Sequence, residues 1–232
     1  MSEVKRKFAT ILATDCVSFS KHMAENEEAT LSSLNSCRAI IDDYIEQHGG
    51  RIFHTAGDSV LAEFASPIET VNCAINFQDR IYERNETLSS NGNDKPLLWR
   101  VGVHCDEVIL ENENVYGNGV NIAARLEAQC SPGQILVSRA INEQVVSRIQ
   151  AISQAAGKKK LKNISDEFEV FSICTEKTTN LGVPTKSSEE QPEIKSQKPM
   201  IAILPFKNLN ANEDSTFLID GIFAVSYTHL TL

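Results

Sequence analysis

Two aspartates stand where strand-like segments of this sequence stop. Asp15 follows the apolar run KFATILAT (residues 7–14), and Asp58 lies at the tip of a hairpin between RIFHT (51–55) and SVLAEF (59–64). If the first strand pairs with this hairpin, the two carboxylates face each other at one edge of a sheet. Such a pair could bind two Mg²⁺ ions for phosphoryl chemistry. On spacing alone, a turn residue at Asp58 and a cap at Asp15 are equally good interpretations.

A second pair of polar residues lies further along the chain. Asn121 and Arg125 are four residues apart in VNIAARLEAQ (120–129), which is predicted to be a helix, so they share one face. An amide and a guanidinium on one face could orient a sugar and bind a phosphate. Spacing alone favours the plainer alternative, a solvated face on which Arg125 pairs with Glu127 or with nothing.

The elements that would position these residues follow a β-α-β-β-α-β order. After the first strand, residues 25–50 have the apolar period of a helix, with Gly49 where a C-cap belongs. After the hairpin, Ser66, Pro67 and Glu69 indicate the N-cap, first position and capping box of a second helix. This order predicts an α+β fold with a ferredoxin-like split βαβ core and additional strands and helices.

The remaining elements extend that core. Segments 97–105 and 107–111 are predicted to be separate strands, and a glycine-rich turn at 114–119 leads into the helix at 120–129. Then come a strand, a helix and two more strands, which we expect at 134–138, 139–149, 159–164 and 169–173.

The composition argues against some classes of function. The 232 residues carry a net charge of −9, which argues against a nucleic-acid-binding surface, although metal ions could still neutralise an anionic substrate. The six cysteines form no C-x-x-C pair, so we expect them to be buried and reduced. No secretory signal and no membrane-spanning stretch is recognisable, and we therefore expect a cytoplasmic protein without a membrane segment.

The composition also predicts domain boundaries. We expect one folded domain over residues 1–175, which the resemblance described below implies to be catalytic, and a polar, proline-containing linker over 176–199. Residues 200–232 begin with the apolar strand MIAILPF and are expected to be the truncated start of a second domain. The last residues, AVSYTHLTL, resemble a translated sequencing-adapter read-through more than a protein sequence.

Residues 8–173 resemble the catalytic domain of class III nucleotidyl cyclases, the adenylate and guanylate cyclase family. Residues 199–221 resemble the segment that follows this domain in bacterial cyclases with tetratricopeptide repeats. The matching cyclase motifs, in order, are ILATDCVSFS, HGGRIFHTAGDSVLAEF, WRVGVHCDEVI, VYGNGVNIAARLEA, GQILVS and KLKNISDEFEVFSI.

The resemblance implies a role for each candidate residue. Asp15 and Asp58 would bind two Mg²⁺ or Mn²⁺ ions per site, with Cys16 beside them, and the backbone after Asp15 would cradle a triphosphate. Asn121 would orient the ribose and Arg125 would stabilise charge on the α-phosphate. The implied substrate-binding residues are Val17, Ser18, Phe19, His54, Gly57 and Asn114.

The resemblance further implies a homodimer that converts ATP to 3′,5′-cyclic AMP and pyrophosphate in intracellular signal transduction. In this family the two carboxylates and the Asn/Arg pair of one site come from different subunits. A diguanylate cyclase is disfavoured because the chain lacks a G-G-[DE]-[EF]-F hairpin.

Four positions depart from the family pattern. His54 and Asn114 stand where adenylate cyclases commonly have Lys and Asp to recognise the purine, and they are compatible with adenine without enforcing it. Ser18 and Asp106 stand where Gly is common. The altered purine positions keep an alternative open, a catalytically weak cyclase-homology module that dimerises, binds nucleotide and regulates a missing C-terminal region.

Overall fold

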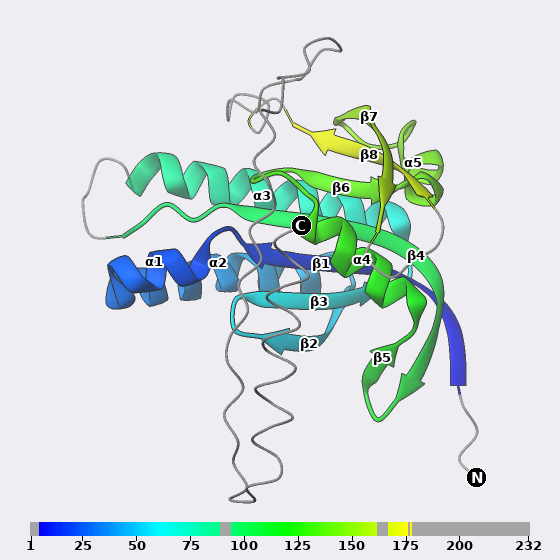
Figure 1. The fold of residues 1–232 in the computed structure, drawn as a ribbon, viewed down its shortest axis with the longest axis horizontal. Helices are drawn as coiled ribbons and strands as arrows, with labels where there is room; N and C mark the ends of the chain where they lie inside the picture. The colour runs from blue at the N-terminus through cyan, green and yellow to red at the C-terminus, as the bar shows by residue number, and fades with distance from the viewer. Residues whose placement is uncertain (1–4, 89–93, 162–166, 176, 178–232) are drawn as a thin grey trace, which may run out of the picture. The chain divides into compact units, whose positions relative to one another are not determined.

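The computed structural model describes residues 5–88, 94–161, 167–175 and 177. The chain divides into two units, 1–184 and 185–232, and the described residues all belong to the first. The expected linker and second domain therefore lie outside the described residues, apart from Lys177, and those boundaries stay predictions. The elements (Figure 1) are β1 Lys5–Cys16, α1 Phe19–Glu25, α2 Glu27–Gln47, β2 Arg51–Ala56, β3 Ser59–Phe64, α3 Pro67–Leu88, β4 Trp99–Glu111, β5 Asn114–Tyr116, α4 Asn118–Ala128, β6 Ile135–Ser138, α5 Arg139–Val145, β7 Ile152–Lys160 and β8 Glu167–Cys174.

One mixed sheet organises these elements. Its strand order is β2-β3-β1-β4-β6-β8-β7, and β5 pairs with β4 beside this path. Strand β1 is antiparallel to both β3 and β4, β2 is antiparallel to β3, and β4 and β6 form a parallel pair. The four strands β2-β3-β1-β4 are the predicted ferredoxin-like core, so the α+β expectation is confirmed.

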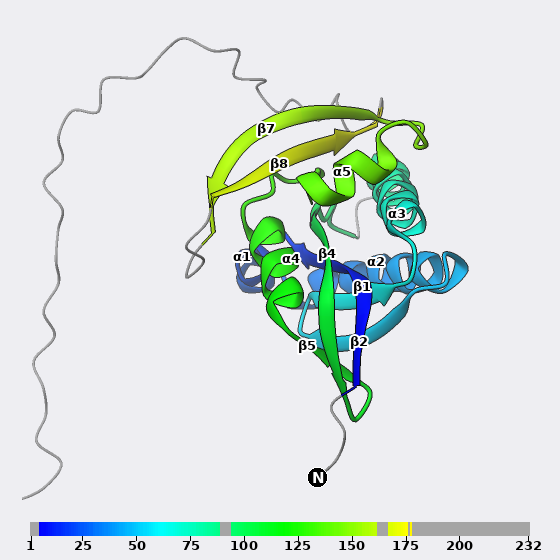
Figure 2. The same ribbon diagram turned by 90° about the vertical axis from the view of Figure 1, so that its right-hand side faces the viewer.

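Helices cover the two faces of this core differently. Figure 2 shows α4 on one side of β4, and α2 and α3 on the other. The larger apolar cluster joins α2 and α3 to the sheet through residues such as Leu12, Ile41 and Phe77. The smaller cluster packs Ile11 and Ala13 of β1 against Ala123 of α4. None of the helices in the described ranges is long and apolar enough to cross a membrane.

The predicted helix caps have mixed outcomes. Gly49 has φ +69°, and the Gly49 and Gly50 amides donate to Glu46 and Ile45, so α2 ends in a Schellman motif as expected. At α3, the Glu69 amide donates to Ser66 Oγ at 3.3 Å, which confirms the N-cap. The Glu69 side chain contacts His48 Nδ1 at 2.7 Å and makes no reciprocal capping bond.

Four predicted element boundaries differ from those in the structure. The helix expected over 25–50 is α2, Glu27–Gln47; it begins after Asn26, which is extended and whose side chain caps α2 by accepting from the Ala29 amide at 3.1 Å, and the separate helix α1 before it was not predicted. The strands expected at 97–105 and 107–111 are one strand, because Asp106 stays paired with Ala9 of β1.

The third wrong boundary concerns the C-terminal hairpin. Strand β7 occupies Ile152–Lys160 where the sequence predicted 159–164, of which residues 162–164 lie outside the described ranges. Gly157 has φ +79° at an irregularity in the pairing with β8, which obscures the strand's alternation. Helix α5 is also shorter than expected, ending at Val145.

Gly102 fixes the distance between β4 and α4. A Cβ atom at this position would lie 2.2 Å from the Glu127 amide nitrogen and 2.3 Å from the Ala123 carbonyl oxygen. Both atoms are backbone, so no side chain can turn aside to make room. The helix therefore lies directly on the strand.

We expect Gly102→Ala to destabilise the protein by about 1–3 kcal/mol, because α4 must move away from β4. The measurement is the thermal midpoint of unfolding of the variant beside the wild type. An unchanged midpoint would mean that α4 is not held by this contact.

Candidate functional site

The two aspartates singled out in the sequence meet at one end of the sheet. Asp15 is the penultimate residue of β1, and Asp58 lies in the turn between β2 and β3. The β1–β3 register pairs Thr14 with Val60 and so brings the two residues together. Gly57 supplies the positive φ, +61°, that this two-residue turn requires.

The electrostatics of this pair favour a bound cation. Burial, and then the neighbouring Asp15 carboxylate, raise the pKa of Asp58. Two half-buried carboxylates side by side resist being ionised together, and a divalent cation between them removes that repulsion. Carboxylate oxygens suit Mg²⁺ or Mn²⁺, which complete their coordination with water and substrate phosphates. No cluster of three or more His, Cys, Asp or Glu side chains that could hold a metal ion occurs in the described ranges.

Cys16, also predicted at the metal site, presents its side chain elsewhere. It is 2% exposed and belongs to the apolar cluster under α2 and α3. Burial raises the pKa of its thiol to about 12, so a thiolate ligand is disfavoured. At this site Cys16 can offer its backbone only.

The expected phosphate loop is a tight turn between β1 and α1. The Val17 amide donates to the Leu98 carbonyl at 2.8 Å, and the Ser18 carbonyl accepts from the amides of Lys21 and His22. Ser18 has φ +56° and ψ +31°, the left-handed region. Phe19 packs against the main core and anchors the start of α1. The left-handed conformation explains why glycine suits position 18.

Asn121 and Arg125 lie on α4, as predicted. Asn121 is exposed and Arg125 is half-buried. Within the described ranges, no hydrogen bond or ion pair joins either residue to Asp15 or Asp58. The alternative pairing of Arg125 with Glu127 is not observed, because Glu127 contacts Arg100.

The two residues expected to recognise the purine, His54 and Asn114, lie on the neighbouring strands β2 and β5. His54 is exposed on β2, and Asn114 is half-buried at the start of β5. Arg51 Nη1 donates to the Glu113 carbonyl at 2.6 Å, which holds β2 against the β4–β5 hairpin. No hydrogen bond joins His54 to Asn114 in the part of the chain that the structure describes.

Sequence reasoning missed two charged residues of this site, Arg100 and Glu127. Arg100 lies opposite Asp15 in the β1–β4 pairing, and its Nη2 is 3.1 Å from Asp15 Oδ2 and 3.1 Å from Glu127 Oε1. A charged residue inside the apolar run LLWRVGVH was the available signal. The register that places it beside Asp15 depends on tertiary pairing.

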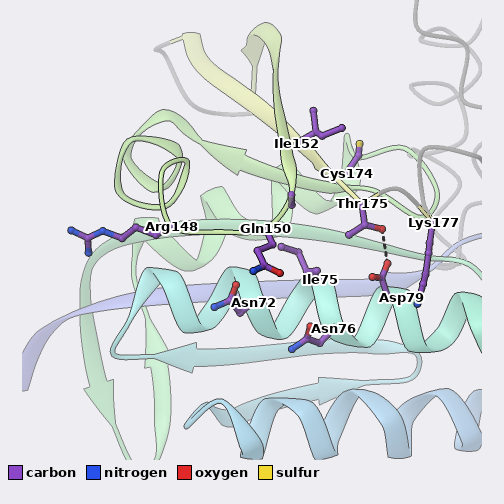
Figure 3. Close-up of a pocket in the computed structure, with 11 residues that line it drawn as sticks. Asn72, Ile75, Asn76, Asp79, Arg148, Gln150, Ile152, Cys174, Thr175 and Lys177 are labelled. Atoms are coloured by element: carbon purple, nitrogen blue, oxygen red, sulfur yellow. Dashed lines mark hydrogen bonds between the residues drawn. The ribbon is translucent and has the colours of Figure 1, made fainter.

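A sizeable hollow lies away from the aspartates. It has a volume of about 880 Å³ and is bounded by α3, the segment before β7, and the end of β8 (Figure 3). Asn72, Asn76 and Asp79 of α3 line it, and Thr175 donates to Asp79 across it. None of the predicted site residues lines this hollow, so its size alone does not make it the active site.

The conformation of Ser18 predicts substitutions of opposite sign. We expect Ser18→Gly to stabilise the protein and Ser20→Gly to destabilise it, each by roughly 0.5–1 kcal/mol. Ser18 is left-handed, whereas Ser20 is an exposed residue inside α1, so Ser20 is the matched control. Thermal unfolding measures both, and equal shifts would contradict the strain at Ser18.

Burial of Glu127 predicts a pH-dependent stability. It raises the pKa of this carboxyl from 4.5 to about 7. Between these values the folded protein binds more protons than the unfolded chain, so the free energy of unfolding falls as pH rises. The contribution is complete below 4.5 and lost above about 7.

We therefore expect the free energy of unfolding of Glu127→Gln not to fall in this way as pH rises, because the glutamine side chain stays neutral. The difference in thermal midpoint, variant minus wild type, should grow by several degrees from pH 5 to pH 8 in metal-free buffer. Glu107→Gln is the control, because Glu107 is an exposed carboxylate paired with Arg6. Parallel pH curves for Glu127→Gln and wild type would disprove the effect.

Comparison with known proteins identifies the family. Residues 3–175 match the family described as "Adenylate and Guanylate cyclase catalytic domain". The chain is 32% identical over 220 residues to the Rhizobium meliloti (strain 1021) protein named "Putative adenylate cyclase 3", which covers 94% of this chain and 37% of that protein. The chain thus spans little more than a third of this relative.

Solved structures of cyclases also match this chain. The crystal structure of an "Adenylate/Guanylate Cyclase/Hydrolase" from Silicibacter pomeroyi has 31% identity and a TM-score of 0.68, covering 74% of this chain and 98% of that one. The adenylyl cyclase CyaB from P. aeruginosa, with 22% identity, a TM-score of 0.67 and coverage of 74% and 96%, shares the fold. The chain therefore belongs to the adenylate and guanylate cyclase family, and residues 3–175 are its cyclase catalytic domain.

Proposed function

We propose that this domain is an adenylate cyclase that converts ATP to 3′,5′-cyclic AMP and pyrophosphate at sites shared by two subunits. The observation that carries the proposal is the Asp15–Asp58 pair at the end of β1, with the pKa of Asp58 raised. Asn121 and Arg125 lie on α4 without a bond to that pair, which suits a site completed by a second copy of the chain.

The reaction forms a bond between the ribose O3′ and the α-phosphorus and breaks the bond from that phosphorus to the bridging oxygen of the β-phosphate. The 3′-hydroxyl proton is lost and pyrophosphate leaves. Asp15 and Asp58 would hold two Mg²⁺ or Mn²⁺ ions, which when bound lower the pKa of the hydroxyl and neutralise the triphosphate.

The other residues would bind and orient the substrate. The Arg125 guanidinium would donate to the α-phosphate as negative charge develops there. The Asn121 amide would fix the ribose so that O3′ faces the α-phosphorus. The tight turn of Val17, Ser18 and Phe19 would lie against the triphosphate.

The preference for adenine rests on His54 and Asn114. The imidazole can donate or accept according to its tautomer, and the amide can do both, so together they can match N1 and the 6-amino group of adenine. Support for ATP also comes from the name of the Rhizobium meliloti relative. Assays of the full chain with ATP and GTP side by side test this preference. Cyclic product from neither nucleotide would favour the nucleotide-binding module instead.

The shared site predicts complementation between inactive chains. Asp58→Asn removes a metal ligand and Arg125→Ala removes the phosphate contact, so each homodimer should be nearly inactive. A mixed dimer has one site with both lesions and one with neither. Co-expression in equal amounts gives mixed dimers as half of the population, so about a quarter of wild-type activity should return.

Two surface substitutions serve as controls. Asp42→Asn and Arg80→Ala each remove one partner of an ion pair, a half-buried one on α2 and an exposed one on α3, and both variants should keep wild-type activity. Mixed dimers that form, as shown by two different affinity tags, and yet stay inactive would place the four residues on one side of a single site.

A further inference from the structure

Arg100 lies between the carboxylates of Asp15 and Glu127 and interacts differently with each. Its Nη2 donates a hydrogen bond to Asp15 Oδ2 at 3.1 Å. The same nitrogen is 3.1 Å from Glu127 Oε1, but that oxygen is buried and has no hydrogen-bond partner. The guanidinium thus makes a hydrogen bond to Asp15 and only an ion pair with Glu127.

The position of Glu127 is set by rigid packing. The Gly102 contact places α4 directly on β4, and Glu127 lies in the last turn of that helix with its side chain 12% exposed. Buried polar atoms usually have a hydrogen-bond partner. The missing hydrogen bond at Glu127 Oε1, at a position fixed by close backbone packing, indicates a donor that reaches this oxygen in another state of the site.

We propose that Arg100 is an internal counter-ion that leaves Asp15 for Glu127 when a divalent metal ion binds Asp15. This inference rests on the metal-binding role of Asp15 in the proposed function. In it, Glu127 is a positioning residue, because it acts on the metal site only through Arg100.

The charges of the site support this exchange. Without a metal ion, the Arg100 guanidinium offsets the repulsion between Asp15 and Asp58. A metal ion at Asp15 repels the guanidinium and competes for the same carboxylate. Because Glu127 is already 3.1 Å away, Arg100 can turn to it and stay paired with a carboxylate. The displacement is then cheap, and Glu127 raises the affinity of the site for metal.

A double-mutant cycle tests the exchange with Mn²⁺ alone as the probe. Mn²⁺ binding to the full-length, nucleotide-free protein is measured by calorimetry for wild type, Glu127→Gln, Arg100→Gln and the double variant. We expect Glu127→Gln to weaken Mn²⁺ binding about tenfold, because Arg100 then stays on Asp15. In the Arg100→Gln background the same change should have no effect, since nothing remains to be transferred.

Two results would overturn the proposal. An equal loss in both backgrounds would mean that the charge of Glu127 acts on the metal directly, and no loss in either would mean that Glu127 has no part in metal binding. Glu107→Gln, an exposed carboxylate paired with Arg6, is the matched control and should bind Mn²⁺ as wild type does.

A second measurement needs no Arg100 variant, in case Arg100→Gln leaves Glu127 unpaired and does not fold. In a crystal structure of the wild type with Mn²⁺, Arg100 should donate to Glu127 and no longer to Asp15. An Arg100 guanidinium still bonded to Asp15 beside the metal would disprove the exchange. If Asp15→Asn binds Mn²⁺ as tightly as wild type, the metal site of the proposed function fails instead.

Discussion

The pairing of β1 with two antiparallel neighbours is the constraint on which the rest of the site depends. Strand β3 on one edge brings the Asp58 turn to Asp15, and β4 on the other edge brings Arg100 to the same carboxylate. Three charged groups from distant parts of the sequence therefore meet because one strand is central. A shift of one residue in either register would turn the charged side chains to the opposite face of the sheet.

Arg100 connects this cluster of charged groups to α4, because it also pairs with Glu127 of that helix. Gly102 removes the side chain that would separate α4 from β4, so the helix and the strand form one body. This strand–helix unit contains Arg100 on β4 and Glu127 in the last turn of α4. It also contains Asn121 and Arg125, which lie earlier in the same helix. In the proposed dimer, the same body would therefore contribute to both active sites.

Much of this architecture was predictable from the sequence, because it depends on local patterns. An apolar run identified β1, alternation identified the β2–β3 hairpin, and the glycines at positions 49 and 57 marked a helix end and a turn. Helix α1 was missed because none of its residues is buried, so it has no apolar stripe to recognise. The pairing of Arg100 with Asp15 and Glu127 was missed for a different reason: it depends on strand register and on the close approach of α4, which no short stretch of sequence encodes. The roles of the site residues stay predictions, although the structure brings Asp15 and Asp58 together.

The burial of all six cysteines has a practical consequence. Cys16, Cys37, Cys73, Cys105, Cys130 and Cys174 are the only cysteines of the chain, and every one lies inside the domain. Buried thiols react slowly with maleimides and other alkylating reagents. A single cysteine introduced on the surface would thus accept a fluorescent label selectively, without removal of the native residues. Two differently labelled populations would then report by energy transfer how quickly chains exchange between the proposed dimers.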